Sequence, residues 1–219
     1  MLKIGLTGAI ASGKSVVGEM FVALGAHLVQ ADRIAHHLML PGQPVYNEVV
    51  RHFGGAILNP DLSVNRSKLA EAAFGSSVNS PHQSSAAPAS SRIEELNRIV
   101  HPAVLRSQNE WMEEIGRQDP HSIAIVEAAL ILEAGAAKSF DCLVVVTCTE
   151  EQRVSRFAAR QKLDLDAARK EVARRMAAQL PEAEKIKAAD YVIDNSRAIE
   201  ETRAQVSQVW HDLPARMHA

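Results

Sequence analysis

A short segment near the start of the chain, GAIASGKS (residues 8–15), combines residue types that bind phosphate. Gly8, Gly13, Lys14 and Ser15 keep the P-loop spacing, and they stand between a strand-like run and a helical pattern. Glycine permits backbone conformations that turn several N–H groups towards one anion, and a helix N-terminus adds a positive dipole end. We expect Lys14 to reach the outer phosphates of a nucleotide and the Ser15 hydroxyl to complete a Mg²⁺ shell.

The rest of the sequence narrows the class of nucleotide-binding protein. The guanine-specifying pattern Asn-Lys-x-Asp is missing, and its nearest counterpart, QKLD (161–164), lies in a basic helical region. No Asp-x-x-Gly occurs, which argues against a GTPase switch. A transporter or motor ATPase usually needs a longer chain. The sequence therefore favours a small-molecule kinase that uses ATP.

Two acidic residues follow predicted strands, where a parallel sheet binds its ligands. Asp32 could accept the proton of an attacking hydroxyl, or it could serve as the N-cap of the next helix. Glu127 ends the run SIAIVE and could hold a Mg²⁺-bound water, or it could be a structural carboxylate. Spacing alone leaves both questions open.

A basic segment follows the fourth predicted strand. Residues 153–175 contain eight Lys/Arg and three Asp/Glu in a chain whose net charge is −2. Arg156 and Arg160 share one helix face, and Arg174 and Arg175 follow later. These arginines form either a solvated basic face or a lid in which at least one arginine contacts phosphate.

Hydrophobic patterning predicts the elements that position these residues. Short apolar runs alternate with helical patterns, which indicates an α/β protein with a parallel sheet. Five strands are expected at 2–7, 27–30, 122–127, 141–148 and 190–193. About 90 residues between the second and third strands read as several helices and form an inserted lobe.

The expected fold is a P-loop kinase core with a five-stranded parallel sheet, an inserted helical acceptor lobe and a helical lid. The predicted boundaries are 1–32 and 121–219 for the core, 33–120 for the lobe and about 153–180 for the lid. Within the lobe, the Ser/Ala/Pro-rich segment 75–91 lacks a period, and we expect it to be flexible.

Composition excludes several partners. The chain has 47% apolar residues, 4% aromatics and a net charge of −2, so we expect no general electrostatic attraction to nucleic acid or membranes. Its apolar runs are too short for a bilayer span, and no signal peptide opens it, so a cytoplasmic protein is expected. Cys142 and Cys148 are expected to be reduced core residues on one strand face. Either a monomer or a weak homo-oligomer fits the sequence.

Several motifs together resemble the dephospho-coenzyme A kinases. The motifs appear in that family's order: IGLTGAIASGKSVV, ADRIAHHLMLPG, HFGGAIL, NRSKLAEAAF, LNRIVHP, ALILEAG, RFAAR and RMAAQLPEAEKIKAADYVIDN. The resemblance runs from Ile4 to about Asn195 and is interrupted by 75–91. It implies MgATP-dependent phosphorylation of the ribose 3′-hydroxyl of dephospho-CoA, giving CoA and ADP.

The resemblance also implies roles for individual residues. Asp32 matches the family's catalytic base, and Lys14 assists the transfer. Arg66 and His101, the latter followed by Pro102, are assigned to the acceptor. Ser15 is assigned to Mg²⁺, with Glu127 acting through a water. The residues expected to bind ATP are Gly8, Ala11, Ser12, Gly13, Lys14, Ser15, Val16, Arg156, Arg160 and Arg175.

Departures from the family pattern leave other functions open. Ala9, Ala11 and Val16 stand at P-loop positions where the family has Gly, Gly and Thr, and an alanine at a positive φ costs about 1 kcal/mol. Gln30 replaces the first Asp of Asp-Ala-Asp, and Glu133 is kept. The alternatives are a kinase of another small acceptor, such as a nucleoside monophosphate or a sugar, and a non-catalytic ATP-binding regulatory protein.

Overall fold

The structure is a computed structural model that describes residues 1–74 and 89–216. It contains two compact units, the first formed by Met1–Gln30 and Trp111–Ala219 and the second by Ala31–Glu110. The strands are β1 (Leu2–Thr7), β2 (His27–Gln30), β3 (Ile123–Glu127), β4 (Cys142–Thr147) and β5 (Tyr191–Asp194). The α-helices are α1 (Lys14–Ala23), α2 (Ala31–Leu38), α3 (Pro44–Phe53), α4 (Arg66–Phe74), α5 (Ala89–Gln118), α6 (Glu150–Gln161), α7 (Leu165–Ala177), α8 (Glu182–Ala188) and α9 (Ile199–Arg216).

The first unit is built on a five-stranded sheet with the order β2-β3-β1-β4-β5. Every neighbouring pair of strands is parallel, so all five carboxyl ends lie at one edge. Strands β3 and β2 lie on one side of β1, whereas β4 and β5 lie on its other side. Open parallel sheets bind ligands at such a switch point, and here the glycine-rich loop follows β1.

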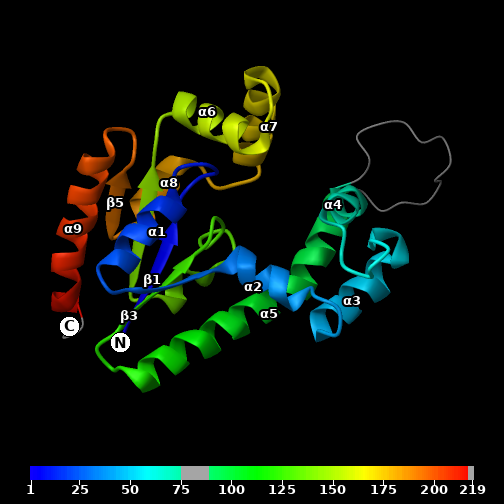
Figure 1. The fold of residues 1–219 in the computed structure, drawn as a ribbon, viewed down its shortest axis with the longest axis horizontal. Helices are drawn as coiled ribbons and strands as arrows, with labels where there is room; N and C mark the ends of the chain where they lie inside the picture. The colour runs from blue at the N-terminus through cyan, green and yellow to red at the C-terminus, as the bar shows by residue number, and fades with distance from the viewer. Residues whose placement is uncertain (75–88, 217–219) are drawn as a thin grey trace. The chain divides into compact units, whose positions relative to one another are not determined.

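Helices cover both faces of this sheet. Ile123 and Ile125 of β3 belong to the core cluster that includes α1 and α9 residues, and Figure 1 shows α9 running beside β5. Ala124 and Val126, which alternate with them, pack against Met112 of α5. Because both faces are buried, β3 reads as a continuous apolar run instead of an alternating one.

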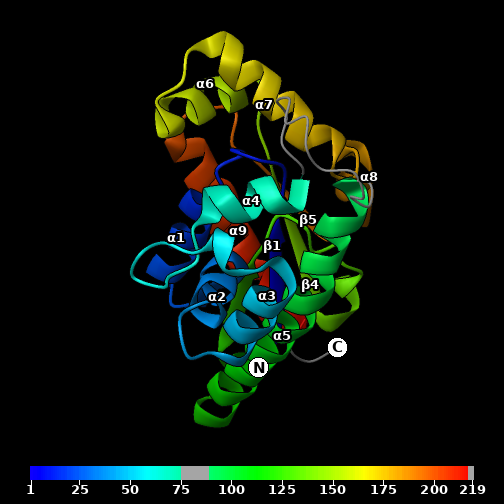
Figure 2. The same ribbon diagram turned by 90° about the vertical axis from the view of Figure 1, so that its right-hand side faces the viewer.

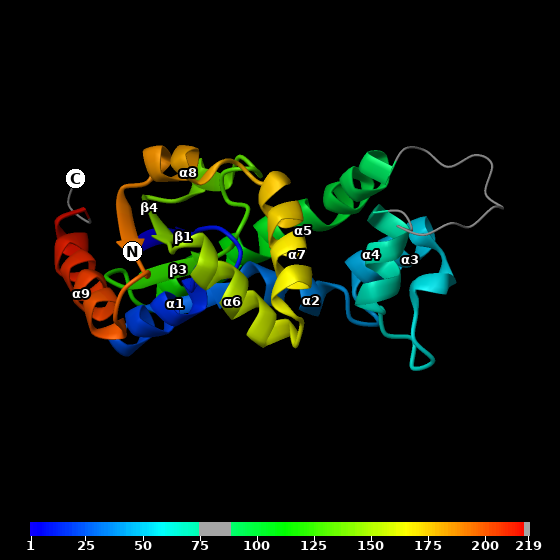
Figure 3. The same cartoon turned by 90° about the horizontal axis from the view of Figure 1, so that it is seen from above.

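Helices α6 and α7 pack against each other in the first unit, as Figure 3 shows. Helix α6 ends before Lys162, which has a φ of 55°. Helix α7 then begins after Asp164, whose side chain accepts a hydrogen bond from the Ala167 N–H at 2.8 Å. Asp164 is therefore the N-cap of α7. Pro181 stands at the N-cap of α8.

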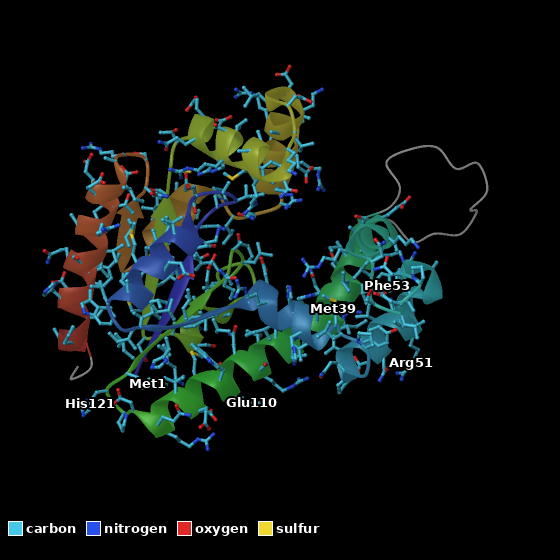
Figure 4. The ribbon with its side chains drawn as sticks, viewed as in Figure 1. Met1, Met39, Arg51, Phe53, Glu110 and His121 are labelled. Atoms are coloured by element: carbon cyan, nitrogen blue, oxygen red, sulfur yellow. The ribbon has the colours of Figure 1, made fainter. Side chains whose placement is uncertain are left out.

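The second unit is helical and contains α2, α3, α4 and the first part of α5, with a 3₁₀ turn at Gly55–Ile57. Figure 2 shows α3 and α4 in cyan tones. Val49 and Phe53, the latter labelled in Figure 4, are buried residues of α3. His52 of α3 contacts Glu95 of α5, with 2.7 Å between Nε2 and Oε2. This hydrogen bond therefore links α3 to α5 within the unit.

The two units meet in the sequence inside α5. Glu110, labelled in Figure 4, is the last residue of the second unit, and the helix continues into the first. Figure 4 also shows Met1 beside His121, and the amino group of Met1 donates a hydrogen bond to the carbonyl of Pro120.

The predicted fold class is confirmed, and each strand lies within one residue of its predicted range. Cys142 and Cys148 are buried as expected, although Cys148 lies just after β4. Of the segment predicted to be flexible, 75–88 lies outside the described residues, and 89–91 belong to α5. Within residues 1–74 and 89–216, no helix is long and apolar enough to cross a membrane.

Candidate functional site

The loop after β1 takes backbone conformations that suit glycine at three positions. Gly8 has a φ of 148°, and Gly13, at the N-cap of α1, has a φ of 99°. Ala11 has a φ of 54°, so this alanine occupies a left-handed conformation. Ala9 does not have a positive φ, and its side chain is buried. Of the three departures from the family loop, only the one at Ala11 therefore carries the expected backbone strain.

Close packing also explains the two glycines. A Cβ at Gly8 would lie 2.3 Å from the carbonyl oxygen of Val146, at the end of β4. A Cβ at Gly13 would lie 2.0 Å from Nδ2 of Asn195, the residue after β5. Both contacts are too short for a real side chain, so the loop fits against the neighbouring strand ends only with glycine at these positions.

A hydrogen-bonded network holds the loop in place. The Asn195 amide donates to the Ser12 carbonyl at 2.9 Å and accepts from the Thr202 hydroxyl at 3.1 Å. The Arg156 guanidinium donates to the same Ser12 carbonyl at 3.3 Å and to the Asn195 carbonyl at 3.0 Å. Asn195 and Thr202 are buried. Arg156 therefore holds the loop in position through these two hydrogen bonds.

The Lys14 ammonium lies across the loop. Its Nζ donates to the carbonyls of Gly8 at 3.0 Å and Ala9 at 2.9 Å. Ser12, which is fully buried, has an Oγ without a hydrogen-bond partner in the described part of the chain. A lysine held against the backbone of a glycine-rich loop, with a buried hydroxyl in the same loop, suits a polyphosphate.

Glu127 is fixed at both carboxylate oxygens. The Ser15 hydroxyl donates to its Oε1 at 2.7 Å, and the Gln30 amide donates to its Oε2 at 2.9 Å. A hydroxyl and a carboxylate beside a phosphate loop are hard oxygen donors, which fit Mg²⁺. Within residues 1–74 and 89–216, no group of three or more His, Cys, Asp or Glu residues could hold a metal. A metal here would therefore need oxygen atoms from water or phosphate as well.

Two of the predicted lid arginines share an aromatic ring. The guanidinium carbons of Arg160 and Arg175 lie 5.8 and 5.4 Å from the centroid of Phe157. Phe157 is buried in the cluster that contains Ile10, and Ala11 packs against this cluster. The contacts link the helices that carry these arginines to the phosphate loop.

The residues predicted for the acceptor belong to the second unit. Asp32 is the second residue of α2 and is exposed, so it stands in the first helical turn and not at the N-cap. Arg66 is exposed at the start of α4. His101 lies in α5, and burial lowers its pKa. The roles of these three residues stay predictions.

Two buried ion pairs were not predicted from the sequence. Lys185 of α8 is 1% exposed and lies 2.8 Å from the Glu133 carboxylate. Its Nζ also donates to the Ala129 carbonyl at 3.0 Å. Arg153, also buried, lies 2.8 Å from Glu182. Both pairs tie the segment after α7 to the core.

Two further residues acquire a role only from the structure. Asn195 directly follows the last strand, at the ligand-binding edge, and this position was a signal that could have identified it. Gln30 was recognised only as a replacement for Asp, because its contact with Glu127 depends on the pairing of β2 with β3.

The family model described as dephospho-CoA kinase matches residues 2–201 of this chain. A protein named dephospho-CoA kinase from Leifsonia xyli is 38% identical over 97% of this chain and 99% of its own. The protein of that name from Corynebacterium efficiens is 36% identical over 99% of this chain and 100% of its own.

Solved structures share the fold. A crystal structure from Thermus thermophilus superposes with a TM-score of 0.75 at 29% identity and covers 97% of both chains. A dephospho-CoA kinase from Campylobacter jejuni superposes with a TM-score of 0.65 at 23% identity and covers 96% of both chains.

Proposed function

Because the chain belongs to the dephospho-CoA kinase family, we propose that it transfers the γ-phosphoryl group of ATP to the ribose 3′-hydroxyl of dephospho-CoA. The products are CoA and ADP, and the reaction is the last step of CoA synthesis. The observation that carries the proposal is the loop at residues 8–15, which packs against the ends of two strands so closely that Gly8 and Gly13 have no room for a side chain. This loop lies within the family match over residues 2–201.

The first unit binds the nucleotide in this proposal. Backbone N–H groups of the loop and the α1 N-terminus bind the phosphates, together with the Lys14 ammonium. Lys14 exchanges its contacts with the Gly8 and Ala9 carbonyls for phosphate oxygens. Ser15 and Glu127 would hold Mg²⁺, with Glu127 acting through a water. When bound, this ion neutralises charge on the phosphates.

The acceptor side uses Asp32, Arg66 and His101 of the second unit. The 3′-oxygen of the acceptor forms a bond to the γ-phosphorus while the bond to the β–γ bridging oxygen breaks. The proton of the hydroxyl passes to the Asp32 carboxylate. Asp32 is two residues beyond β2 in the sequence, which supports its assignment to the ligand-binding edge.

Arginines of the α6–α7 region contribute positive charge. Arg160 and Arg175 contact the phosphates, and Arg156 keeps the loop in its binding conformation through the Ser12 carbonyl. Closure of this region would exclude water, which would otherwise compete with the acceptor. We place the reaction in the cytoplasm, where thiols such as Cys142 and Cys148 stay reduced, and we propose a monomer or weak homo-oligomer.

The proposal is tested by measuring ADP release with separate acceptors. The purified chain is given MgATP with dephospho-CoA, with AMP, with a hexose or with no acceptor. We expect ADP only with dephospho-CoA, together with a product that carries one added phosphate on the ribose 3′-oxygen. Faster turnover of AMP or the hexose would assign another acceptor. Tight ATP binding without ADP release would indicate a regulatory protein.

A further inference from the structure

Glu171 of α7 binds two consecutive arginines in different ways. The Arg174 side chain donates from Nε to one carboxylate oxygen and from a terminal nitrogen to the other, both at 2.8 Å. The Arg175 side chain donates to Oε1 at 2.6 Å, and it does so from Nε. One carboxylate therefore receives a two-point contact from Arg174 and a single contact from Arg175.

The Arg175 guanidinium is oriented by a second contact. Its carbon lies 5.4 Å from the centroid of the Phe157 ring, which is 1% exposed. That ring is fixed because it packs with Val154, Val172 and the loop residue Ile10. A guanidinium that is bound at Nε and stacked on a buried ring has its plane and direction defined. The contacts that hold it leave its terminal nitrogens for another ligand.

The side chains of Glu171, Arg174 and Arg175 together carry a net charge of +1. Hydrogen bonds from Arg174, and then from Arg175, lower the pKa of Glu171 to about 2, so the carboxylate is ionised at neutral pH. Arg174 supplies the counter-charge for Glu171 through its two-point contact. Arg175 is thereby held by a carboxylate whose charge is already matched, and its own charge stays effective towards an anion.

We propose that Glu171 is a positioning residue that holds Arg175 by Nε, against Phe157, so that its terminal nitrogens bind a phosphate of the nucleotide. Arg174 is the counter-ion of Glu171 and does not itself contact the nucleotide. This inference rests on the proposed function, because it assumes that Arg175 binds ATP. It adds the residues that fix the direction of that arginine.

A simpler interpretation is a helix-surface ion pair. Pairs at (i, i+3) and (i, i+4) on exposed helices contribute weakly to stability and do not affect catalysis. Under that interpretation, loss of Glu171 changes the unfolding midpoint slightly and leaves the kinetics with ATP unchanged. The two interpretations therefore differ in a kinetic constant, not only in stability.

The first test is Glu171→Gln, which keeps the size of the side chain and removes its charge. With saturating dephospho-CoA, we expect kcat/KM for ATP to fall about tenfold, because a misdirected guanidinium loses its oriented contact with phosphate. KM for dephospho-CoA should change less than about twofold. Glu150→Gln is the matched control, because Glu150 of α6 pairs with Arg169 at 3.9 Å, and Arg169 is not among the arginines assigned to ATP. It should retain the wild-type constants.

The second test is a double-mutant cycle with Arg175→Met. If Glu171 acts through Arg175, then Glu171→Gln should have no further effect on kcat/KM for ATP once Arg175 is methionine. An equal, roughly tenfold loss in both backgrounds would overturn the inference. So would unchanged kinetics of the Glu171→Gln enzyme beside a slow Arg175→Met enzyme.

These outcomes are separable from a failure of the proposed function. If the wild-type chain does not phosphorylate dephospho-CoA, the proposed function itself is wrong. If the wild type is active and Arg175→Met is equally active, then Arg175 does not bind ATP, and this inference fails with that assignment. Arg174→Met provides a further check, because an unmatched Glu171 should then neutralise Arg175 and raise KM for ATP.

Discussion

The phosphate loop and the predicted acceptor residues differ in how firmly the structure holds them. In the first unit, the loop is fixed by the Asn195 and Arg156 hydrogen bonds and by glycines that no other residue could replace. In the second unit, Asp32 and Arg66 are exposed side chains on short helices. The proposed nucleotide-binding loop is therefore held in place by its own packing and hydrogen bonds, whereas the proposed acceptor residues are defined by residue type and by position in the chain.

This contrast separates two kinds of experimental effect. Substitutions around the loop should change nucleotide binding and stability together, because the same bonds support both. Substitutions of the exposed acceptor residues should change turnover and leave stability nearly unchanged.

The largest effect is expected for Lys14→Ala. This change removes the ammonium that lies across the loop, and turnover should fall by about 10³-fold or more because developing phosphate charge loses its main side-chain partner. Steady-state ADP release measures the loss. Lys138→Ala, which removes an exposed lysine from the turn before β4, should keep wild-type turnover. A Lys14→Ala enzyme with near-normal turnover would remove this lysine from the mechanism.

A large stability effect is expected for Lys185→Met. The change leaves the largely buried Glu133 carboxylate without its counter-charge, and loss of one partner of a buried ion pair costs about 3–5 kcal/mol. Urea denaturation gives the free energy of unfolding. The double variant Lys185→Met/Glu133→Leu should recover part of it, and Lys187→Met, at an exposed ion pair, should stay within about 0.5 kcal/mol. Equal losses in both lysine variants would show that burial of Lys185 is unimportant.

A pH-dependent effect is expected for Gln30→Glu. Two carboxylates would then meet where the Gln30 amide now donates to Glu127 at 2.9 Å, and their repulsion raises the pKa of one above its unfolded value. Folding then favours the protonated acid, so without metal the variant should be less stable at pH 8 than at pH 5, by about 1–2 kcal/mol.

Denaturation in EDTA at the two pH values tests the Gln30 prediction. Gln118→Glu provides the control, because Gln118 donates to Glu114 in a similar bond on an exposed helix surface, where water screens the charges. A pH dependence as large in Gln118→Glu as in Gln30→Glu would show that the Glu127 site is not special.

The smallest effect is expected for Ala11→Gly. Glycine relieves the strain of the positive φ of 54°, which stabilises the fold by about 1 kcal/mol. The variant also loses a methyl group that packs against the cluster containing Phe157, and glycine increases the conformational entropy of the unfolded chain. Together these two effects cost a similar amount of stability. The free energy of unfolding should therefore change by less than about 1 kcal/mol. A change in the free energy of unfolding above about 2 kcal/mol in either direction would show that backbone strain and the loss of the methyl group do not offset each other.

The sequence predicted the parts of this molecule that depend on local pattern. The strand Leu2–Thr7 and the glycine-rich loop after it follow from apolar periodicity and residue type, and the structure confirms them. The parallel sheet follows from runs such as SIAIVE that are apolar on both faces.

Other features depend on which strands become neighbours, and periodicity does not contain that information. The bond from Gln30 to Glu127 exists because β2 pairs with β3, although about 90 residues separate them in the sequence. Lys185 belongs to a charged helix segment that reads as solvated, yet it is buried against Glu133. The orientation of Arg175 by Glu171 and Phe157 likewise required the packing of α6 on α7.

The central claim is that an acid from the second unit takes the acceptor's proton while the first unit holds the nucleotide. Single-turnover formation of CoA and the ATP dissociation constant should be measured on the same Asp32→Asn protein, with Asp166→Asn as a control in the first turn of α7. We predict an unchanged dissociation constant and a rate that is lower by about 10²–10⁴-fold. An unchanged rate, with ATP bound as in the wild type, would contradict the claim.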